Sequence, residues 1–415
     1  MRGIKIKNFK DLTKDKDVII FDARYVYIPV MDATLNVRRG SNVLVGSVLA
    51  TDSKWDMPIL SSVSGKVVDY EEKYCYTGEM VRTIKIENNF KNEHVECDTK
   101  PIDEYTKEEF VDMLKKFAVR GMSGANFPTY IKYQNSEIDN LIINAVECSP
   151  YITADYALMK ENLDTILKTI DAIMKINNIK KAYFAIKENN SDIIKELNIK
   201  LKDYKNIKIS KIKNLYPAGW ERNLVNEIIG KDYKNIPLEI HTVVNNVTTI
   251  MSINDALNGR YTSRRIVTFA GDGLKKNANA SMLIGQDISF VLDELGHKKR
   301  NLVLVVDGPM MGKTIKEENF VITGNVNSVL LLKKMDDEFV SPCIRCGRCN
   351  LVCPVGLTPI MIKENINNIK MLKELKAEKC IECGLCSYVC PAKIMLKEHV
   401  INAKKNVRDK DETRN

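Results

Sequence analysis

The sequence predicts a multidomain protein that combines α/β and α+β units, and three observations lead to this fold class. The chain has 415 residues, which corresponds to roughly three domains. Strand-like and helix-like patterns alternate over residues 104–258, whereas residues 25–103 and 259–338 show mainly short strands. Eight of the eleven cysteines lie between residues 343 and 390, so we expect the last part of the chain to form a separate cysteine-based domain.

The first hundred residues predict a small β scaffold. Residues 1–24 are rich in Lys and Asp with short apolar runs, and their pattern assigns them no role. Residues 25–103 follow as short strands separated by Gly, Asp and Asn. Gly40, Gly46 and Gly65 lie where tight turns are expected, because glycine adopts backbone conformations that other residues avoid.

The middle of the chain predicts a largely parallel sheet covered by helices. Thr106 and Glu109 have the spacing of a capping box, so a helix is expected to begin after Thr106. Strands are expected at residues 141–146, 181–187 and 206–210, with a long apolar-striped helix around residues 158–173. Ser191 is the expected N-cap of a further helix.

Residues 259–338 predict another β-rich unit with one amphipathic helix at residues 289–296. The segment between the two cysteine runs is long enough for one or two helices. Residues 397–415 form a charged tail. Its end, KKNVRDKDETRN (404–415), mixes both signs of charge, and we expect this end to be disordered.

The cysteines form two copies of one pattern, C-x2-C-x2-C-x3-C-P, which holds a [4Fe–4S] cluster in bacterial two-cluster proteins. The first copy contains Cys343, Cys346, Cys349 and Cys353, and the second contains Cys380, Cys383, Cys386 and Cys390. In the two-cluster arrangement the fourth thiolate of each cluster comes from the other copy. We therefore assign Cys390 to the cluster of the first copy and Cys353 to the cluster of the second.

A zinc module is the alternative for these cysteines, because structural zinc sites also use C-x2-C pairs. Zinc gives no reason for the repeated third-cysteine spacing, or for Pro354 and Pro391 directly after the last cysteines. Disulfides are not expected, since the chain shows no signal peptide. The cysteines Cys75, Cys97 and Cys148 have no metal-ligand spacing. The pattern therefore favours two [4Fe–4S] clusters and an electron-carrying protein.

The composition of the chain limits its expected cellular location and the classes of molecule that it is expected to bind. The net charge is +9, which fits either docking of an acidic partner or basic residues spread over solvated faces. No apolar run reaches the roughly 18 to 20 residues that a membrane span needs. We therefore expect a cytoplasmic protein, either free or peripheral on the cytoplasmic face of a membrane. No nucleic-acid motif is present, and the four histidines form no catalytic set.

Six segments resemble one family, the RnfC proteins of the Rnf electron-transport complex. They are GMSGANFPTYIK (121–132), LIINAVECSPYITADY (141–156), VVNNVTT (243–249), RIVTFAGDG (265–273), DGPMMG (307–312) and CIRCGRCNLVCPVGLTP (343–359). The resemblance covers nearly the whole chain, from about residue 25 to 395. The proline-reductase-associated electron-transfer proteins are a related branch, and the middle domain is similar to the FMN/NADH subunit of respiratory complex I.

The resemblance implies four domains. They are a barrel-sandwich hybrid at residues 25–103, an FMN/NADH-type α/β domain at 104–258, a β-grasp-like (SLBB) domain at 259–338 and a two-cluster [4Fe–4S] ferredoxin-type domain at 339–396. An N-terminal segment (1–24) and a charged tail (397–415) flank them. The implied FMN and NAD(H) contacts are Gly121, Gly124, Asn144, Glu147, Asn245 and Asn246. Glycine-rich loops beside a helix suit phosphate, because their backbone amides can approach it.

Four positions depart from the family pattern around this implied pocket. Ser123 and Asn126 replace loop glycines, Ser149 replaces a carboxylate, and Trp220 replaces a small glycine. Two functions therefore stay open. The first is transfer of electrons between NAD(H)/FMN and a ferredoxin or Rnf-type partner proteins through two clusters, as an NADH:acceptor oxidoreductase subunit. The second is a soluble relay without flavin that feeds a terminal reductase such as a proline reductase.

Overall fold

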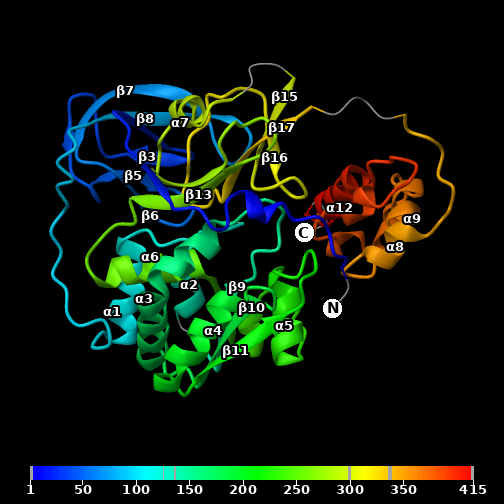
Figure 1. Cartoon of the computed structure of the whole chain (residues 1–415), viewed down its shortest axis with the longest axis horizontal. Helices are drawn as coiled ribbons and strands as arrows, with labels where there is room; N and C mark the ends of the chain where they lie inside the picture. The colour runs from blue at the N-terminus through cyan, green and yellow to red at the C-terminus, as the bar shows by residue number, and fades with distance from the viewer. Residues whose placement is uncertain (1–2, 125, 135–136, 298–300, 335–338, 413–415) are drawn as a thin grey trace.

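Four β-sheets organise the chain in a computed structural model that describes residues 3–124, 126–134, 137–297, 301–334 and 339–412. Three sheet-containing modules lie together, and a helical cysteine module lies to one side of them (Figure 1). The prediction of a multidomain protein with mixed α and β structure is confirmed. The predicted boundary between residues 338 and 339 borders residues 335–338, which lie outside the described part.

The β module consists of two sheets packed around one apolar core. The first has the order β2-β8-β7-β4 and the second the order β3-β5-β6. The strands are β2 (Tyr25–Pro29), β3 (Ala33–Leu35), β4 (Asn42–Val43), β5 (Val48–Asp52), β6 (Met57–Leu60), β7 (Gly65–Tyr74) and β8 (Met80–Asn88). A side chain at Gly65 would collide with the carbonyl of Glu87 on β8, so this turn requires glycine.

The α/β module carries a four-stranded sheet in the order β11-β10-β9-β12, and every neighbouring pair is parallel, as predicted. Its strands are β9 (Asn140–Ala145), β10 (Lys181–Lys187), β11 (Ile207–Ile212) and β12 (Thr242–Asn246). Its helices are α1 (Lys107–Lys116), α2 (Thr129–Tyr133), α3 (Ala154–Ile176), α4 (Ser191–Lys200), α5 (Glu221–Ile229) and α6 (Val247–Leu257). Most of its large apolar side chains lie in one core between the sheet and helices α1, α3, α4 and α6.

Two capping predictions in this module have different outcomes. Thr106 caps α1, and Glu109 returns the bond to the Thr106 amide, so the capping box is confirmed. The N-cap prediction for Ser191 is wrong, because Ser191 is the first residue of α4 and Asn190 occupies the cap position. Asn and Ser are both cap-type residues and stand side by side here, so the pattern alone does not decide between them.

The mixed-sheet module contains a six-stranded sheet in the order β1-β14-β13-β17-β15-β16. Its elements are β1 (Ile19–Phe21), β13 (Arg264–Ala270), β14 (Ala278–Leu283), α7 (Ser289–Leu295), β15 (Leu302–Val306), β16 (Lys313–Ile315) and β17 (Ser328–Lys333). Strand β1 comes from the N-terminal segment and pairs parallel with β14. The N-terminal segment, which had no expected role, therefore completes one edge of this sheet.

The cysteine module is built from short helices and one long helix. They are α8 (Arg348–Val352), α9 (Pro359–Glu364), α10 (Ile369–Glu374), α11 (Leu385–Tyr388) and α12 (Leu396–Glu412). The expected disorder of the end of the charged tail is wrong over residues 404–412, because α12 extends through them. Val400, Ala403 and Val407 lie on one face of α12 and are buried against α9 and α10. Residues 413–415 lie outside the described part.

The N-terminal segment ties the modules together. Ile4 exchanges backbone hydrogen bonds with Tyr216, at 3.2 and 2.9 Å. Farther along, the Thr13 hydroxyl lies 2.7 Å from the Thr153 hydroxyl, and Asn279 donates a hydrogen bond to the Thr13 carbonyl. Figure 1 shows this blue segment crossing from the sheets toward the cysteine module. None of the helices in the described part is both long and apolar enough to cross a membrane.

Candidate functional site

The α/β module has a topological switch point between β9 and β12. From β9 the chain continues to β10 and β11 on one side, whereas β12 lies on the other side of β9. In open parallel sheets, ligands bind in the crevice outside the carboxyl ends of the strands at such a point. Asn144 lies near the end of β9 and Asn246 ends β12, and the two residues are register partners on these adjacent strands.

A cavity of about 430 Å³ opens at this switch point. Its lining includes four of the six residues that were predicted to contact FMN or NAD(H): Gly121, Gly124, Asn144 and Asn246. Apolar side chains from several elements form much of the wall, among them Phe127, Ile131, Ile236, Leu238 and Val244. The volume lies within the range of small-molecule and cofactor sites, about 300–1,000 Å³.

The two asparagines in the wall also hold the backbone around the cavity. Asn144 donates to the carbonyl of Gly219 at 2.9 Å and accepts from the amide of Val146 at 3.0 Å. Asn246 caps α6 by accepting from the Thr248 amide at 2.8 Å. Both residues therefore fix the loops that shape the cavity, in addition to lining it.

The other two predicted contacts lie outside the cavity wall. Asn245 is buried and donates to the Tyr133 hydroxyl at 2.6 Å. Glu147 is held by the N-terminal segment, because the Lys10 ammonium lies 3.0 Å from its carboxylate. Burial raises the pKa of Glu147 to about 7, while Lys10 opposes this rise. The structure thus brings four of the six residues together and separates these two from them.

The four departures from the family pattern do not gather around the cavity. Ser123 and Trp220 line it. Asn126 lines a different cavity beside the β module and has a left-handed backbone, with φ of 53°. Ser149 lies against the loop at Gly308, between β15 and β16. The expectation of four changes around one pocket is therefore wrong for Asn126 and Ser149.

Two charged residues in the cavity wall were not singled out from the sequence. Lys132 donates to the carbonyl of Val244 at 2.7 Å, and burial lowers the pKa of its ammonium. Glu221 begins α5 directly after Trp220 and also lines the cavity. The signal for Lys132 was present, because a lysine one turn into the helix after a glycine loop can reach a bound phosphate.

The cysteines gather in two groups, each of which draws on both copies of the motif. Cys343, Cys346, Cys349 and Cys390 line one cavity of about 420 Å³; we call them the outer group. The inner group is Cys353, Cys380, Cys383 and Cys386. Burial, together with the neighbouring thiols of the same group, raises the pKa of Cys383 to about 11 and of Cys386 to about 12.

The predicted assignment, in which the fourth cysteine of each cluster comes from the other copy of the motif, requires this grouping. That the cysteines bind clusters stays a prediction. Thiols with raised pKa values in a crowded, low-dielectric site become thiolates when metal ions supply the compensating charge. Within the described ranges, no three His, Cys, Asp or Glu side chains are close enough to hold a single metal ion. The shared cavity and the chemistry of four soft sulfur donors fit an iron–sulfur cluster.

Three domain families match this chain in the expected order. The RnfC barrel sandwich hybrid domain matches residues 1–91, the Nuo51 FMN-binding domain matches residues 114–255, and the 4Fe-4S dicluster domain matches residues 342–394. These matches support FMN and iron–sulfur clusters as the cofactors, in the α/β module and the cysteine module respectively.

Curated relatives extend the similarity over most of the chain. The C component of the proton-translocating ferredoxin:NAD(+) oxidoreductase complex of Clostridium ljungdahlii is 32% identical over 339 residues, which cover 79% of this chain and 74% of that protein. The chain belongs to the RnfC family. The C component of the Na(+)-translocating ferredoxin:NAD(+) oxidoreductase complex of Acetobacterium woodii is 28% identical, and the match covers 79% of this chain and 77% of that protein.

The fold of this RnfC-family chain is also similar to solved structures. The crystal structures of NAD+-reducing [NiFe]-hydrogenase in the H2-reduced and air-oxidized states give TM-scores of 0.51 and 0.52. Both comparisons cover 75% of this chain, and they cover 62% and 69% of the hydrogenase chains, at 13% and 14% identity. At this identity the likeness concerns the fold alone.

In this RnfC-family chain the inner cysteine group lies against the α/β module. The Tyr216 hydroxyl donates to the carbonyl of Cys383 at 2.8 Å. Cys383, Tyr216 and Trp220 belong to the same apolar cluster, together with Ile4 and Met310. Trp220 therefore forms part of the wall of the cavity at the switch point and part of the packing around the inner group. In the outer group, Cys346 is exposed.

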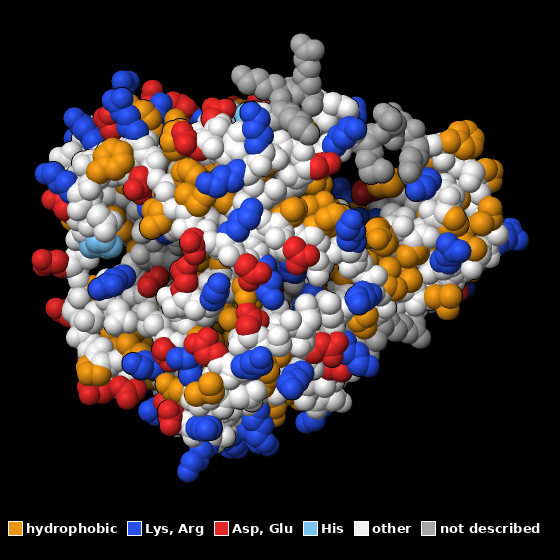
Figure 2. All heavy atoms as spheres, in the orientation of Figure 1, with side chains coloured by type: hydrophobic (Ala, Val, Ile, Leu, Met, Phe, Trp, Pro, Cys, Tyr) orange, Lys and Arg blue, Asp and Glu red, His pale blue; other side chains and the backbone are white. Residues whose placement is uncertain are grey.

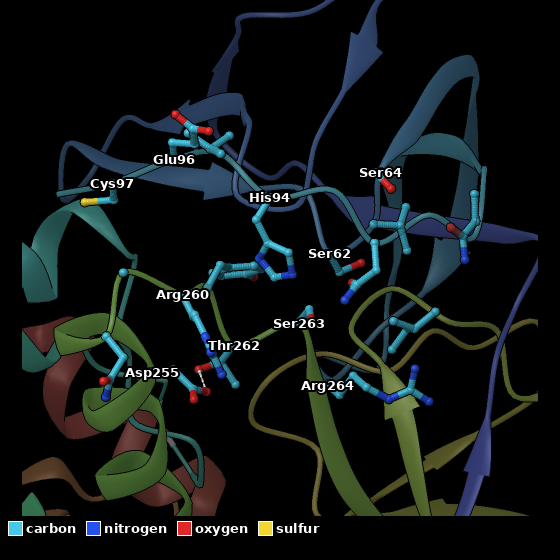
Figure 3. A pocket seen from close by; sticks show the side chains of 18 of the residues that line it. Ser62, Ser64, His94, Glu96, Cys97, Asp255, Arg260, Thr262, Ser263 and Arg264 are labelled. Carbon is cyan, nitrogen blue, oxygen red and sulfur yellow. Dashed lines mark hydrogen bonds between the residues drawn. The ribbon is translucent and has the colours of Figure 1, made fainter. Parts of the chain in front are cut away.

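A larger cavity, of about 1350 Å³, lies elsewhere, between the β module and the end of α6. Figure 3 shows its polar lining, with Asp255, Arg260, Thr262 and Arg264 below His94. Some of its charged groups are paired: Thr262 donates to Asp255 at 2.9 Å, and Arg264 pairs with Asp22 at 2.7 Å. None of the six residues that were predicted to contact FMN or NAD(H) lies in the wall of this cavity.

Proposed function

We propose that this chain transfers electrons between NAD(H) and a protein partner, as the RnfC component of an ion-translocating ferredoxin:NAD+ oxidoreductase complex. The supporting observation is the position of Trp220, which lines the flavin-type cavity and belongs to the same apolar cluster as Cys383. The curated relatives carry this activity in their names. One continuous line of residues therefore connects a cofactor-sized cavity with the inner cysteine group.

The cavity residues divide the work of holding FMN. The loop at Gly124 offers its backbone amide to a phosphate, and a side chain at Gly124 would meet only open space. Gly121 shapes the loop instead, because its amide donates to the Phe127 carbonyl at 2.8 Å. Lys132 supplies a positive charge in the same wall. Phe127 and Trp220 supply aromatic surface for a planar ring. Asn144 holds the Gly219 carbonyl and so positions the loop that carries Trp220.

When bound, FMN exchanges a hydride with NAD(H) and releases electrons singly, and each [4Fe–4S] cluster carries one electron at a time. The protein positions these groups and excludes water from the inner group, where Cys353 and Cys383 are buried. We propose the order cavity, inner group, outer group, partner, because only the outer group reaches the surface at a cysteine. The chain itself then acts as an NADH:acceptor oxidoreductase subunit.

The remaining modules are proposed to be scaffolds. We assign the β module to the barrel-sandwich hybrid type and the mixed-sheet module to the β-grasp-like (SLBB) type. The proposed location is peripheral on the cytoplasmic face of a membrane, beside the membrane proteins of the complex. The alternative, a relay without flavin, is less well supported because the cavity persists despite Ser123 and Trp220.

The deciding experiment combines cofactor analysis with flavin binding. Anaerobically purified protein is expected to contain about eight irons, since each cluster holds four. The chain has two tryptophans, so a Trp55→Phe variant leaves Trp220 as its single tryptophan reporter. Added FMN should quench Trp220 fluorescence, and NADH should then bleach the clusters. Eight irons without quenching, and without reduction by NADH, would establish the flavin-less relay instead.

A further inference from the structure

The two copies of the cysteine motif have opposite surroundings at equivalent positions. Ile381 follows the first cysteine of the second copy and is 7% exposed, because it packs among Tyr216, Ile4 and Met310. Ile344 occupies the same position in the first copy and is 65% exposed. One sequence pattern therefore presents the same apolar side chain to a protein surface in one copy and to solvent in the other.

Two further equivalent positions also differ between the two copies, both in charge and in contacts. The second copy has Glu382, which pairs with Lys404 at 2.8 Å, and the buried Leu385. The first copy has Arg345 and Arg348 at these two positions, and both are exposed. The uncovered copy thus combines an exposed isoleucine with two arginines, beside the exposed Cys346.

More exposed apolar side chains continue this surface. Leu351 on α8 is 78% exposed, and Met361 on α9 lines the outer-group cavity together with Ile344. Figure 2 shows several hydrophobic side chains on the outside of the cysteine module, with basic side chains among them. We define the outer face as Ile344, Arg345, Arg348, Leu351 and Met361. Exposed apolar side chains that cluster at one place usually mark an interaction site.

We propose that the outer face docks an acidic protein that carries a one-electron redox group near its surface. The apolar side chains would be covered by the carrier, as Ile381 is covered by the α/β module. Arg345 and Arg348 would attract its negative charge, which raises the rate of encounter. Small interfaces below about 1,200 Å² are typical of such transient redox encounters.

This inference rests on the proposed function in one respect, namely that the outer group carries an electron. In the docked complex one electron leaves the reduced outer cluster and reduces the carrier, with no bond made or broken. The electron can be supplied chemically by dithionite. The test is therefore independent of FMN and NADH, and a failure of docking can be distinguished from a failure of flavin entry.

The experiment compares two charge-reversed variants that change the net charge equally. Arg345→Glu/Arg348→Glu alters the outer face, whereas Arg38→Glu/Arg39→Glu alters exposed arginines of the β module. Each dithionite-reduced protein is mixed with a negatively charged plant-type [2Fe–2S] ferredoxin and, separately, with a positively charged cytochrome c. Bimolecular reduction rates are measured at low and high salt, together with dissociation constants for the oxidised ferredoxin.

The outer-face variant should reduce the ferredoxin roughly tenfold more slowly at low salt, with weaker binding, and should reduce cytochrome c faster. The control variant should behave as the unmodified protein, and the difference should shrink at high salt. Leu351→Ser should weaken ferredoxin binding at both salt concentrations. Equal effects of the two double variants, with full iron content, would overturn the proposal. If the outer-face double variant loses iron, the single variants Arg348→Gln and Leu351→Ser replace it. Their rates of ferredoxin reduction are then compared with that of the unmodified protein, and unchanged rates would overturn the proposal.

Discussion

The hydroxyl of Tyr216 donates a 2.8 Å hydrogen bond to the backbone carbonyl of Cys383, across the boundary between the α/β module and the cysteine module. Tyr216 is fully buried and also exchanges backbone hydrogen bonds with Ile4 of the N-terminal segment. Three parts of the chain that are distant in sequence therefore meet at one residue. This contact orients the inner cysteine group toward the cavity wall at Trp220.

Replacing Tyr216 with Phe should loosen this boundary without removing a ligand. The Cys383 carbonyl would lose its buried partner, which typically costs about 1–3 kcal/mol. We expect the iron content to stay unchanged. The backbone amides of residues 381–388 should exchange hydrogen faster than in the unmodified protein. Tyr204→Phe, on the same module but away from the boundary, is the control. Unchanged exchange in the Tyr216 variant would show that the hydrogen bond does not hold the cysteine module in place.

Double cysteine variants test the composition of the two groups. Cys346→Ser/Cys390→Ser removes two predicted ligands of one cluster, so about four of eight irons should remain. Cys346→Ser/Cys353→Ser removes one ligand from each cluster, so both should be lost or weakened. Ligation within each copy predicts the reverse order of iron content. Cys97→Ser, which changes a cysteine outside the motif, should keep all the iron.

Much of the fold was predictable because it depends on local patterns. The capping box at Thr106, the parallel sheet and the domain order follow from short-range spacing and from the resemblance. The helix through residues 397–412 was missed because its mixed charges obscured an apolar stripe. Leu396, Val400, Ala403 and Val407 are spaced at four, three and four residues, which is typical of one buried helix face.

The candidate site was predictable only in part. Asn245 and Asn246 were both expected to contact FMN, yet neighbouring side chains on a strand point to opposite faces. Alternation alone does not decide between them here, because the consecutive residues 242–244 of β12 also line the cavity. The structure places Asn246 in the cavity wall and Asn245 against the Tyr133 hydroxyl. The ion pair between Lys10 and Glu147 joins residues that are far apart in the chain. Such a contact depends on tertiary packing, and no local pattern indicates it.

Ser123 and Asn126 form a matched pair for testing the flavin site. Ser123 lines the cavity, so Ser123→Gly should raise FMN affinity severalfold by letting the loop amides approach the phosphate. Asn126 lines a different cavity, so Asn126→Gly should leave the affinity unchanged. Quenching of Trp220 in the Trp55→Phe background measures both dissociation constants. Equal effects of the two changes would show that Ser123 does not face the bound phosphate.

The ionisation of Glu147 should make stability depend on pH. Burial raises its pKa to about 7 in the folded chain, above the ordinary carboxyl value. Between these two values the folded chain binds more protons than the unfolded chain. The free energy of unfolding therefore falls as pH rises through this window, by up to about 3 kcal/mol in total.

Glu147→Gln should remove this part of the pH dependence. Thermal unfolding of the anaerobic protein at about pH 6 and pH 8 should show a smaller loss of stability on raising the pH than in the unmodified chain. The exposed Glu317→Gln should leave the loss unchanged. Lys10→Met removes the ammonium that opposes the raised pKa, so it should enlarge the loss. An equal loss in the Glu147 and Glu317 variants would mean that Glu147 titrates near its ordinary pKa, because Lys10 compensates fully for its burial.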